Sequence, residues 1–167
     1  MCRFCDTDFV GTDGELGAKY RDADSLAQMV DSLWPAAYAA SKYVVFTGGE
    51  PLLQLDDALI ERMHTYGFEI AVETNGTLMV PAGVDWVCVS PKAGAQLQVR
   101  KGDELKVVIP QENQDLHDYE SLEFDNFFVQ PMAGPNLESN TRFAIEFCKK
   151  NPKWKLSLQT HKLLQIP

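Results

Sequence analysis

Two cysteines near the start of the chain, Cys2 and Cys5, form a C-x-x-C pair that is followed at once by Asp6, Thr7 and Asp8. Such a pair places two thiolates on one side of a loop, where they can share a metal ion or an iron–sulfur cluster. A structural zinc site needs four ligands, and the sequence has no second C-x-x-C pair and no H-x-x-x-H pair. A thioredoxin-like dithiol needs a preceding strand, and no strand is predicted there. A cluster site and a thiol site both remain open.

The other two cysteines fit regular elements. Cys88 alternates with Trp86 in a predicted strand, and Cys148 follows Phe147 in a predicted helix. Buried cysteine behaves as a small apolar residue. We therefore expect both to be packing residues rather than ligands.

Polar residues follow five of the six predicted strands. These strand ends are residues 47–51 (TGGEP), 73–76 (ETNG), 90–92 (SPK), 130–132 (QPM) and 159–162 (QTHK). The remaining strand, the fourth, ends at Pro110, and this end suggests no ligand site. Ligands gather at the carboxyl ends of parallel strands, so this row of polar ends predicts a binding site.

Each of these motifs also has a structural interpretation. Residues 47–51 suit a tight turn, although a ligand that needs close backbone approach would use the same glycines. Residues 73–76 suit an Asn-Gly turn, while Ser90 and Lys92 suit either a solvated loop or a site for a carboxylate or hydroxyl. His161 is a candidate general base or a hydrogen-bonded structural residue. No G-x-G-x-x-G or P-loop motif is present, so the sequence does not support a dinucleotide or P-loop site.

The elements that would position these ends alternate along the chain. Strands are predicted over residues 43–46, 68–74, 84–89, 104–109, 127–129 and 154–158. Helices are predicted from a cap at Asp24 or Ser25 to before Pro35, from a cap at Asp56 to Gly67, over 116–122, and from a cap at Asn140 to before Pro152. Parallel strands need crossover connections, so this order predicts a parallel α/β sheet, either open or curved into a barrel or part of one.

Bulk composition narrows the class of protein. The 167 residues predict a single domain over 1–167, and the formal charge of −9 argues against a broad nucleic-acid interface. No apolar run is long enough for a membrane span and no signal-peptide pattern is seen. Four cysteines without a secreted disulfide pattern favour a reducing cytoplasm.

Six motifs together resemble one family. CRFCDTDF, TGGEP, ETNG, VSPK, VQPM and the terminal QTHKLLQIP are similar, in this order, to 7-carboxy-7-deazaguanine synthases of the radical S-adenosylmethionine (radical SAM) superfamily. The resemblance implies an α/β fold, a partial parallel (β/α) barrel of the radical SAM type. It also implies conversion of 6-carboxy-5,6,7,8-tetrahydropterin to 7-carboxy-7-deazaguanine with loss of ammonia, in 7-deazapurine (queuosine) biosynthesis.

The resemblance further implies roles for individual residues. Cys2 and Cys5 would bind a 4Fe-4S cluster, Thr7 would bind Mg2+, and Thr47 and the carboxylate of Pro167 would contact the substrate. The residues implied to border S-adenosylmethionine are Phe4, Cys5, Asp6, Gly49, Ser90, Pro91, Lys92, Gln130, Pro131, Met132 and Ala133. No residue is assigned as an acid or base catalyst.

The family pattern has three cluster cysteines. Cys2 and Cys5 would be the second and third, and the first lies upstream of CRFCDTDF. We therefore expect the chain to lack the first strand and helix of the barrel, and to be inactive as it stands. The implied partners are a homodimeric second copy and a flavodoxin-like electron donor. A glycyl-radical-enzyme activase, a cluster-less purine- or pterin-binding module and a thiol oxidoreductase are the alternative functions.

Overall fold

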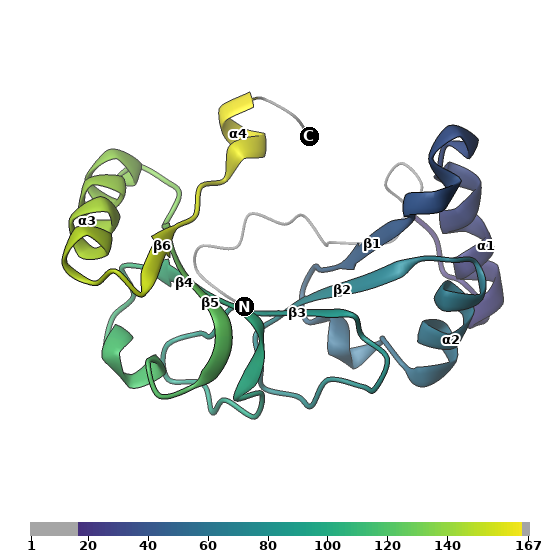
Figure 1. The fold of residues 1–167 in the computed structure, drawn as a ribbon, viewed down its shortest axis with the longest axis horizontal. Helices are drawn as coiled ribbons and strands as arrows, with labels where there is room; N and C mark the ends of the chain where they lie inside the picture. The colour runs from purple at the N-terminus through teal and green to yellow at the C-terminus, as the bar shows by residue number, and fades with distance from the viewer. Residues whose placement is uncertain (1–16, 165–167) are drawn as a thin grey trace. The chain divides into compact units, whose positions relative to one another are not determined.

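A computed structural model describes residues 17–164 of the chain, and these divide into two compact units (Figure 1). Within this range, the first unit comprises residues 17–74 and 78–87, and the second comprises residues 75–77 and 88–164. The prediction of a single domain over 1–167 stays a prediction. Each unit is described separately below.

The first unit begins with helix α1 (Ala23–Leu33), whose amino end is closed by a capping box. Asp22 Oδ1 accepts a hydrogen bond from the Ser25 amide at 2.9 Å, and Ser25 Oγ accepts from the Asp22 amide at 3.3 Å. The predicted cap at Asp24 or Ser25 is therefore wrong. Ser25 is the third residue of the helix, where its hydroxyl closes the box that Asp22 opens.

The remaining elements of the first unit form a parallel strand pair with helical connections. In chain order they are the 3-10 helix η1 (Ala36–Ser41), β1 (Tyr43–Phe46), the 3-10 helix η2 (Pro51–Leu53), α2 (Asp57–Thr65) and β2 (Glu69–Thr74). Asp56 caps α2 through the Leu59 amide at 2.9 Å, as predicted. Strands β1 and β2 pair in parallel, so their carboxyl ends lie at the same edge.

The core of the first unit lies between its helices and β2. Met63, Ile70 and Val72 are fully buried, and the Trp34 ring meets the Phe68 ring edge to face at 5.7 Å. Burial of each such aliphatic side chain contributes about 1.5–3 kcal/mol. This packing gives β1 and β2 a fixed support on which their polar ends can be held.

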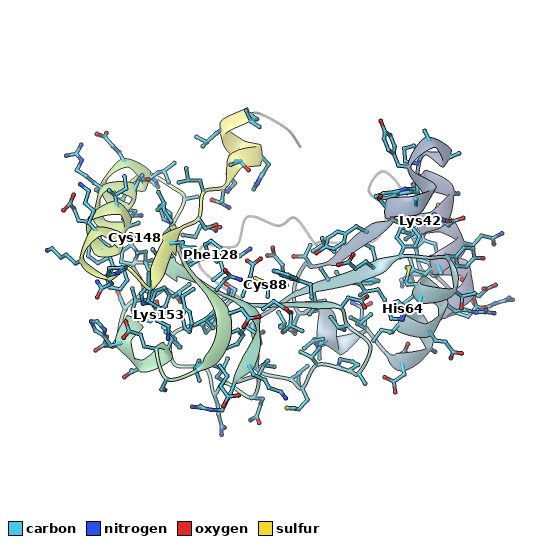
Figure 2. The ribbon with its side chains drawn as sticks, in the orientation of Figure 1. Lys42, His64, Cys88, Phe128, Cys148 and Lys153 are labelled. Atoms are coloured by element: carbon cyan, nitrogen blue, oxygen red, sulfur yellow. The ribbon has the colours of Figure 1, made fainter. Side chains whose placement is uncertain are left out.

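Lys42, labelled in Figure 2, bridges α1 and the end of α2. Its Nζ donates to an Asp31 carboxylate oxygen and, at 2.9 Å, to the Tyr66 carbonyl, and lies 5.3 Å from the centre of the Phe68 ring. The half-buried charge is thus paired, as a charge away from water must be.

The second unit contains a parallel run of strands. They are β3 (Trp86–Val89), which the chain enters from the first unit, β4 (Lys101–Ile109), β5 (Glu123–Pro131) and β6 (Trp154–Leu156). Strand β4 pairs with β3 and β5, and β5 with β6, all in parallel. Strands β4 and β5 begin before their predicted starts at residues 104 and 127. Their first residues are mostly polar, so the apolar pattern did not reveal them although they pair in register.

Three helices accompany these strands. They are the 3-10 helix η3 (Leu116–Tyr119), α3 (Leu137–Lys150) and α4 (Thr160–Leu164). The predicted cap of α3 at Asn140 is wrong, because the helix begins at Leu137 and Asn140 Nδ2 donates to the Met132 carbonyl at 2.9 Å. Helix α3 packs on β5 and β6 through an edge-to-face ring cluster in which the Trp154 ring lies 5.8 Å from the Phe147 ring and 5.3 Å from the Phe127 ring.

Asp85 fastens the chain before β3 to β2. Its amide donates to the Ile70 carbonyl at 2.9 Å, and its Oδ2 accepts from the Ile70 amide at 2.8 Å and lies 2.9 Å from His64 Nε2. Partial burial raises the pKa of Asp85, but the hydrogen bonds from His64 and Ile70 and the charge of His64 outweigh it and leave the pKa below its ordinary value. The His64 side chain, also labelled in Figure 2, therefore has a structural partner.

The turn after β2 is closed by Gly76. Its carbonyl accepts from the amides of Gln98 at 2.8 Å and Val99 at 3.1 Å, and Asn75 Oδ1 accepts from the Thr77 amide at 2.8 Å. The residue is buried at φ +76°, and a Cβ there would lie 2.5 Å from Leu97 Cδ1. The Asn-Gly turn interpretation of residues 73–76 is thus confirmed at its glycine.

Gly76→Ala should lower the free energy of unfolding by about 3 kcal/mol, because a side chain both strains this backbone and overlaps its neighbours. Gly94 is the matched control, since it has the same φ of +76° but no atom within 4 Å of where a Cβ would stand. Gly94→Ala should cost only about 1 kcal/mol. Urea denaturation measures both, and equal losses would show that crowding at Gly76 is unimportant.

Asp85→Asn should lower the free energy of unfolding by about 1 kcal/mol at pH 7. Because the folded pKa of Asp85 is depressed, its contribution is present above its ordinary pKa and is lost as pH falls through the folded value. The difference between wild type and variant should therefore shrink in acid. Denaturation curves at several pH values test this, with Glu61→Gln, an exposed carboxylate of α2, as control; a gap that is constant with pH would contradict it.

Candidate functional site

Part of the predicted site lies outside the described residues 17–164. This part consists of Cys2, Phe4, Cys5, Asp6, Thr7 and Pro167. The other predicted residues are distributed over the two units, and the structure brings them together only within each unit.

In the first unit, the turn after β1 exposes its backbone. Thr47 and Gly49 are exposed, and Gly48 has φ +116°, a conformation that favours glycine. Among residues 17–164, no atom lies within 4 Å of where a Cβ would stand on Gly48 or Gly49. The backbone groups of this turn are therefore open to a ligand, as the ligand-binding interpretation of residues 47–51 requires.

Glu50 holds this turn in place. Its Oε1 accepts from the Leu52 amide at 3.2 Å, which caps η2, and from the Thr74 hydroxyl at 2.6 Å. The turn after β1 is thereby joined to the last residue of β2. Residues 47–51 are thus both a fixed turn and an open backbone surface, so the two interpretations of the motif are compatible.

In the second unit, the loop after β3 carries a positioned ammonium group. Lys92 Nζ donates to the Ser90 carbonyl and to Ser90 Oγ, each at 2.8 Å. Pro91 between them is buried, and Lys92 is half-buried. Ser90, Pro91 and Lys92 form one compact group instead of a loosely solvated loop.

Gln111, which the sequence did not suggest, braces this loop. Its Oε1 accepts from the Ala93 amide at 3.1 Å, and its Nε2 donates to the Val108 carbonyl at 2.8 Å. The interpretation of the fourth strand end as one without a polar role was therefore wrong. A glutamine just after a strand that ends in proline was the available signal, but its bonds depend on a loop 18 residues away.

The third group in the second unit is the end of β5. Ser157 Oγ donates to Gln130 Oε1 at 3.4 Å, and the Met132 amide donates to the Ile109 carbonyl at 2.7 Å. The Met132 carbonyl in turn accepts from Asn140. Residues 130–132 are therefore tied to β4, to the chain after β6 and to α3.

The remaining candidates for thiol or acid–base chemistry are less well placed. Cys88 is 4% exposed, and burial raises the pKa of the half-buried Cys148 thiol, which makes it a poor nucleophile. Both positions are labelled in Figure 2. His161 lies exposed on α4. Across the described part of the chain, no three His, Cys, Asp or Glu side chains are grouped so that they could hold a metal ion.

Chemically, these groups suit binding better than proton transfer. In the second unit, the ammonium of Lys92 and the amide of Gln130 are groups that can bind a carboxylate or another hydrogen-bonding group, and in the first unit the backbone at Gly49 is exposed. Each unit therefore supplies groups of a kind that suits a polar cofactor such as S-adenosylmethionine.

Comparison with known proteins points to one family. The family model of the Radical SAM superfamily matches residues 1–109. The 7-carboxy-7-deazaguanine synthase of Burkholderia multivorans is 60% identical over 167 residues, which are 100% of this chain and 79% of that protein. The synthase of Bradyrhizobium diazoefficiens is 54% identical over 165 residues, covering 99% of this chain and 78% of its own.

The fold is found again in a solved structure. The crystal structure of QueE from Escherichia coli aligns with a TM-score of 0.64 and 26% identity over 82% of this chain and 63% of that chain. The prediction of a parallel α/β fold of the radical SAM type is confirmed. Since both the family model and close relatives along the whole chain agree, the chain belongs to the 7-carboxy-7-deazaguanine synthase family of the radical SAM superfamily.

Proposed function

We propose that this chain, expressed with any in-frame sequence upstream of Met1, catalyses the reaction for which its relatives are named, forming 7-carboxy-7-deazaguanine from 6-carboxy-5,6,7,8-tetrahydropterin with loss of ammonia. The observation that carries the proposal is the 60% identity over all 167 residues to a named synthase. The relatives described above are synthases, which favours this reaction over a glycyl-radical-enzyme activase or a cluster-less binding module.

The proposed cofactors are a 4Fe-4S cluster and S-adenosylmethionine, the pair that defines the superfamily. Together they supply one-electron radical chemistry when bound. Cys2 and Cys5 would ligate the cluster, and Phe4, Cys5 and Asp6 would border the adenosyl cofactor. Thiolates are the usual protein ligands of such clusters.

The described residues would position the cofactor rather than react with it. The open backbone of Gly49 would meet its methionine end. Ser90, Pro91 and Lys92 would supply a hydroxyl, a rigid turn and a cation. Gln130, Pro131, Met132 and Ala133 would also border the cofactor. Positioning of this kind lowers a barrier by holding reactants in the productive geometry.

The substrate would be held by a second set of residues. Thr47 would contact it, and the terminal carboxylate of Pro167 would accept hydrogen bonds from the guanidine-like edge of the pterin. A Mg2+ ion bound by Thr7 would order the substrate's carboxylate, because a hard cation prefers oxygen ligands. Such an ion would also help an acidic chain of net charge −9 to bind an anion.

The proposed partners are a second copy of the chain and a flavodoxin-like electron donor. Large apolar side chains on α3 and after β6 are exposed, including Phe143 (51%) and Leu163 (65%), and association of two copies would remove such surface from water. Nowhere in residues 17–164 is there a helix long and apolar enough to cross a membrane. The cytoplasmic location is part of the proposal.

Cys5→Ala should abolish the cluster. Protein expressed from the complete open reading frame, with any in-frame sequence upstream of Met1, and purified without oxygen should hold about four iron and four sulfide per chain. The variant should hold about one iron or fewer. Cys148→Ala is the control, because this half-buried cysteine lies in α3, and its iron content should equal that of the wild type.

Iron and sulfide assays with visible absorbance make this measurement. A Cys5→Ala protein with a normal cluster would remove Cys5 from the ligand set. A colourless, iron-free wild-type protein would overturn the proposed function itself.

Deletion of Pro167 should raise KM for the pterin at least about tenfold, because it moves the terminal carboxylate by about 3.5 Å and loses charge-assisted hydrogen bonds. Pro167→Ala is the matched control, since it keeps both chain length and the terminal carboxylate. Steady-state kinetics at saturating S-adenosylmethionine measure the effect. An unchanged KM after deletion would contradict this role and would fit an activase, which has no use for a terminal carboxylate.

A further inference from the structure

The core of the first unit contains a buried polar side chain at the end of β2. Thr74 is 2% exposed, and Ile70 and Val72, earlier in the same strand, are fully buried. Burial of a hydroxyl costs free energy unless the group is hydrogen-bonded. A valine would fill the same space without that cost, so the hydroxyl itself calls for an explanation.

The Thr74 hydroxyl donates to a carboxylate on a neighbouring turn. Its Oγ1 lies 2.6 Å from Glu50 Oε1, a separation typical of a charge-assisted O–H···O bond. The same oxygen accepts from the Leu52 amide at 3.2 Å. One carboxylate oxygen therefore joins the end of β2 to the first turn of η2, across 24 residues of sequence.

This contact is placed where it can control the turn after β1. The register pairs Phe46, the last residue of β1, with Val72, and β2 continues to Thr74, so the segment 47–50 leaves the sheet beside the last residues of β2. Two of its residues are Gly48 and Gly49, which have the largest conformational freedom of any residue type. Hydrogen bonds of the Glu50 side chain hold this segment in place.

We propose that Thr74 is a positioning residue for S-adenosylmethionine, acting through Glu50. Its hydroxyl holds the Glu50 carboxylate, and the carboxylate fixes the backbone of residues 47–50 in the open conformation that meets the cofactor. Thr74 itself touches neither cofactor nor substrate. This inference rests on the proposed function, because it assumes that the cofactor binds at this turn.

A purely structural role for Thr74 predicts different behaviour. If the hydroxyl only formed a hydrogen bond that stabilises the core, its removal would change the melting temperature and leave cofactor binding by the folded protein intact. A positioning role instead affects KM for S-adenosylmethionine and spares kcat, since a saturating cofactor restores the turn. Under a positioning role, removal of the hydroxyl also makes the turn more mobile in the cofactor-free protein.

The test compares Thr74→Val with Thr74→Ser in anaerobically prepared holoenzyme. Valine keeps the shape but removes the hydroxyl, and KM and Kd for S-adenosylmethionine should rise about fivefold to tenfold with kcat within about twofold of wild type. Serine retains the hydroxyl and should restore both constants. Thr65→Val is the matched control, because Thr65 Oγ1 donates to the Glu61 carbonyl on α2, away from the turn; its constants should be those of the wild type.

A second measurement does not depend on activity. Amide hydrogen exchange of the segment 47–53, which includes the Leu52 amide bound by Glu50, should be about fivefold faster in cofactor-free Thr74→Val than in wild type or Thr74→Ser. Val is favoured in strands, so the variant is expected to fold. Thr74→Ala takes its place in both measurements if the melting curve of the valine variant is lost.

The outcomes separate the two proposals. Wild-type KM and exchange in Thr74→Val, or failure of Thr74→Ser to restore them, would overturn the positioning role while the proposed function stands. A fall in kcat with KM unchanged would do the same. If the wild-type protein neither binds nor cleaves S-adenosylmethionine, the proposed function fails, and the assignment of Thr74 to that cofactor fails with it.

Discussion

The structure depends most on the parallel pairing of its strands. Because neighbouring strands run in the same direction, each strand end lies beside the end of its neighbour, as β1 and β2 show in the first unit and β4 and β5 in the second. Each end must then turn away into a loop whose backbone groups are no longer paired in the sheet. Those unpaired groups are both a cost to the fold and a resource for binding.

In each unit, single polar side chains form hydrogen bonds with groups of these loops. Glu50 receives the Thr74 hydroxyl and the Leu52 amide, Gln111 receives an amide from the loop after β3, and Asn140 donates to the loop after β5. Each fastens one loop to a neighbouring element, so the loop need not rely on a ligand for its shape. Preorganised loops lose less entropy when a cofactor binds. The residues proposed to contact a ligand are therefore supported by hydrogen bonds within the chain.

The division between these two kinds of residue explains what could be predicted. Periodicity and turn residues predicted every strand and the principal helices, and β1 has the predicted bounds. The cap at Asp22 was missed because Asp22, Asp24 and Ser25 are all capping residue types, and only the hydrogen bonds choose between them. The start of α3 was missed because Asn136 precedes the helix without a side-chain capping bond, whereas Asn140 lies inside it. Gln111 was missed because its bond to the Ala93 amide joins residues 18 apart in sequence. The motifs predicted a ligand site at the strand ends, whereas the contacts that support those motifs follow only from the folded chain.

Charge in this protein must also be considered locally. The chain carries a net charge of −9, yet the proposed cofactor and substrate both present carboxylates. At physiological salt, charges farther apart than about 8 Å are largely screened. The net charge therefore matters less to a bound carboxylate than the few donors within reach of it. Lys92, whose ammonium group donates to Ser90 in a half-buried loop, is proposed to be such a donor, and its charge is screened less than one in open water. An acidic surface and an anion site are compatible because they act over different distances.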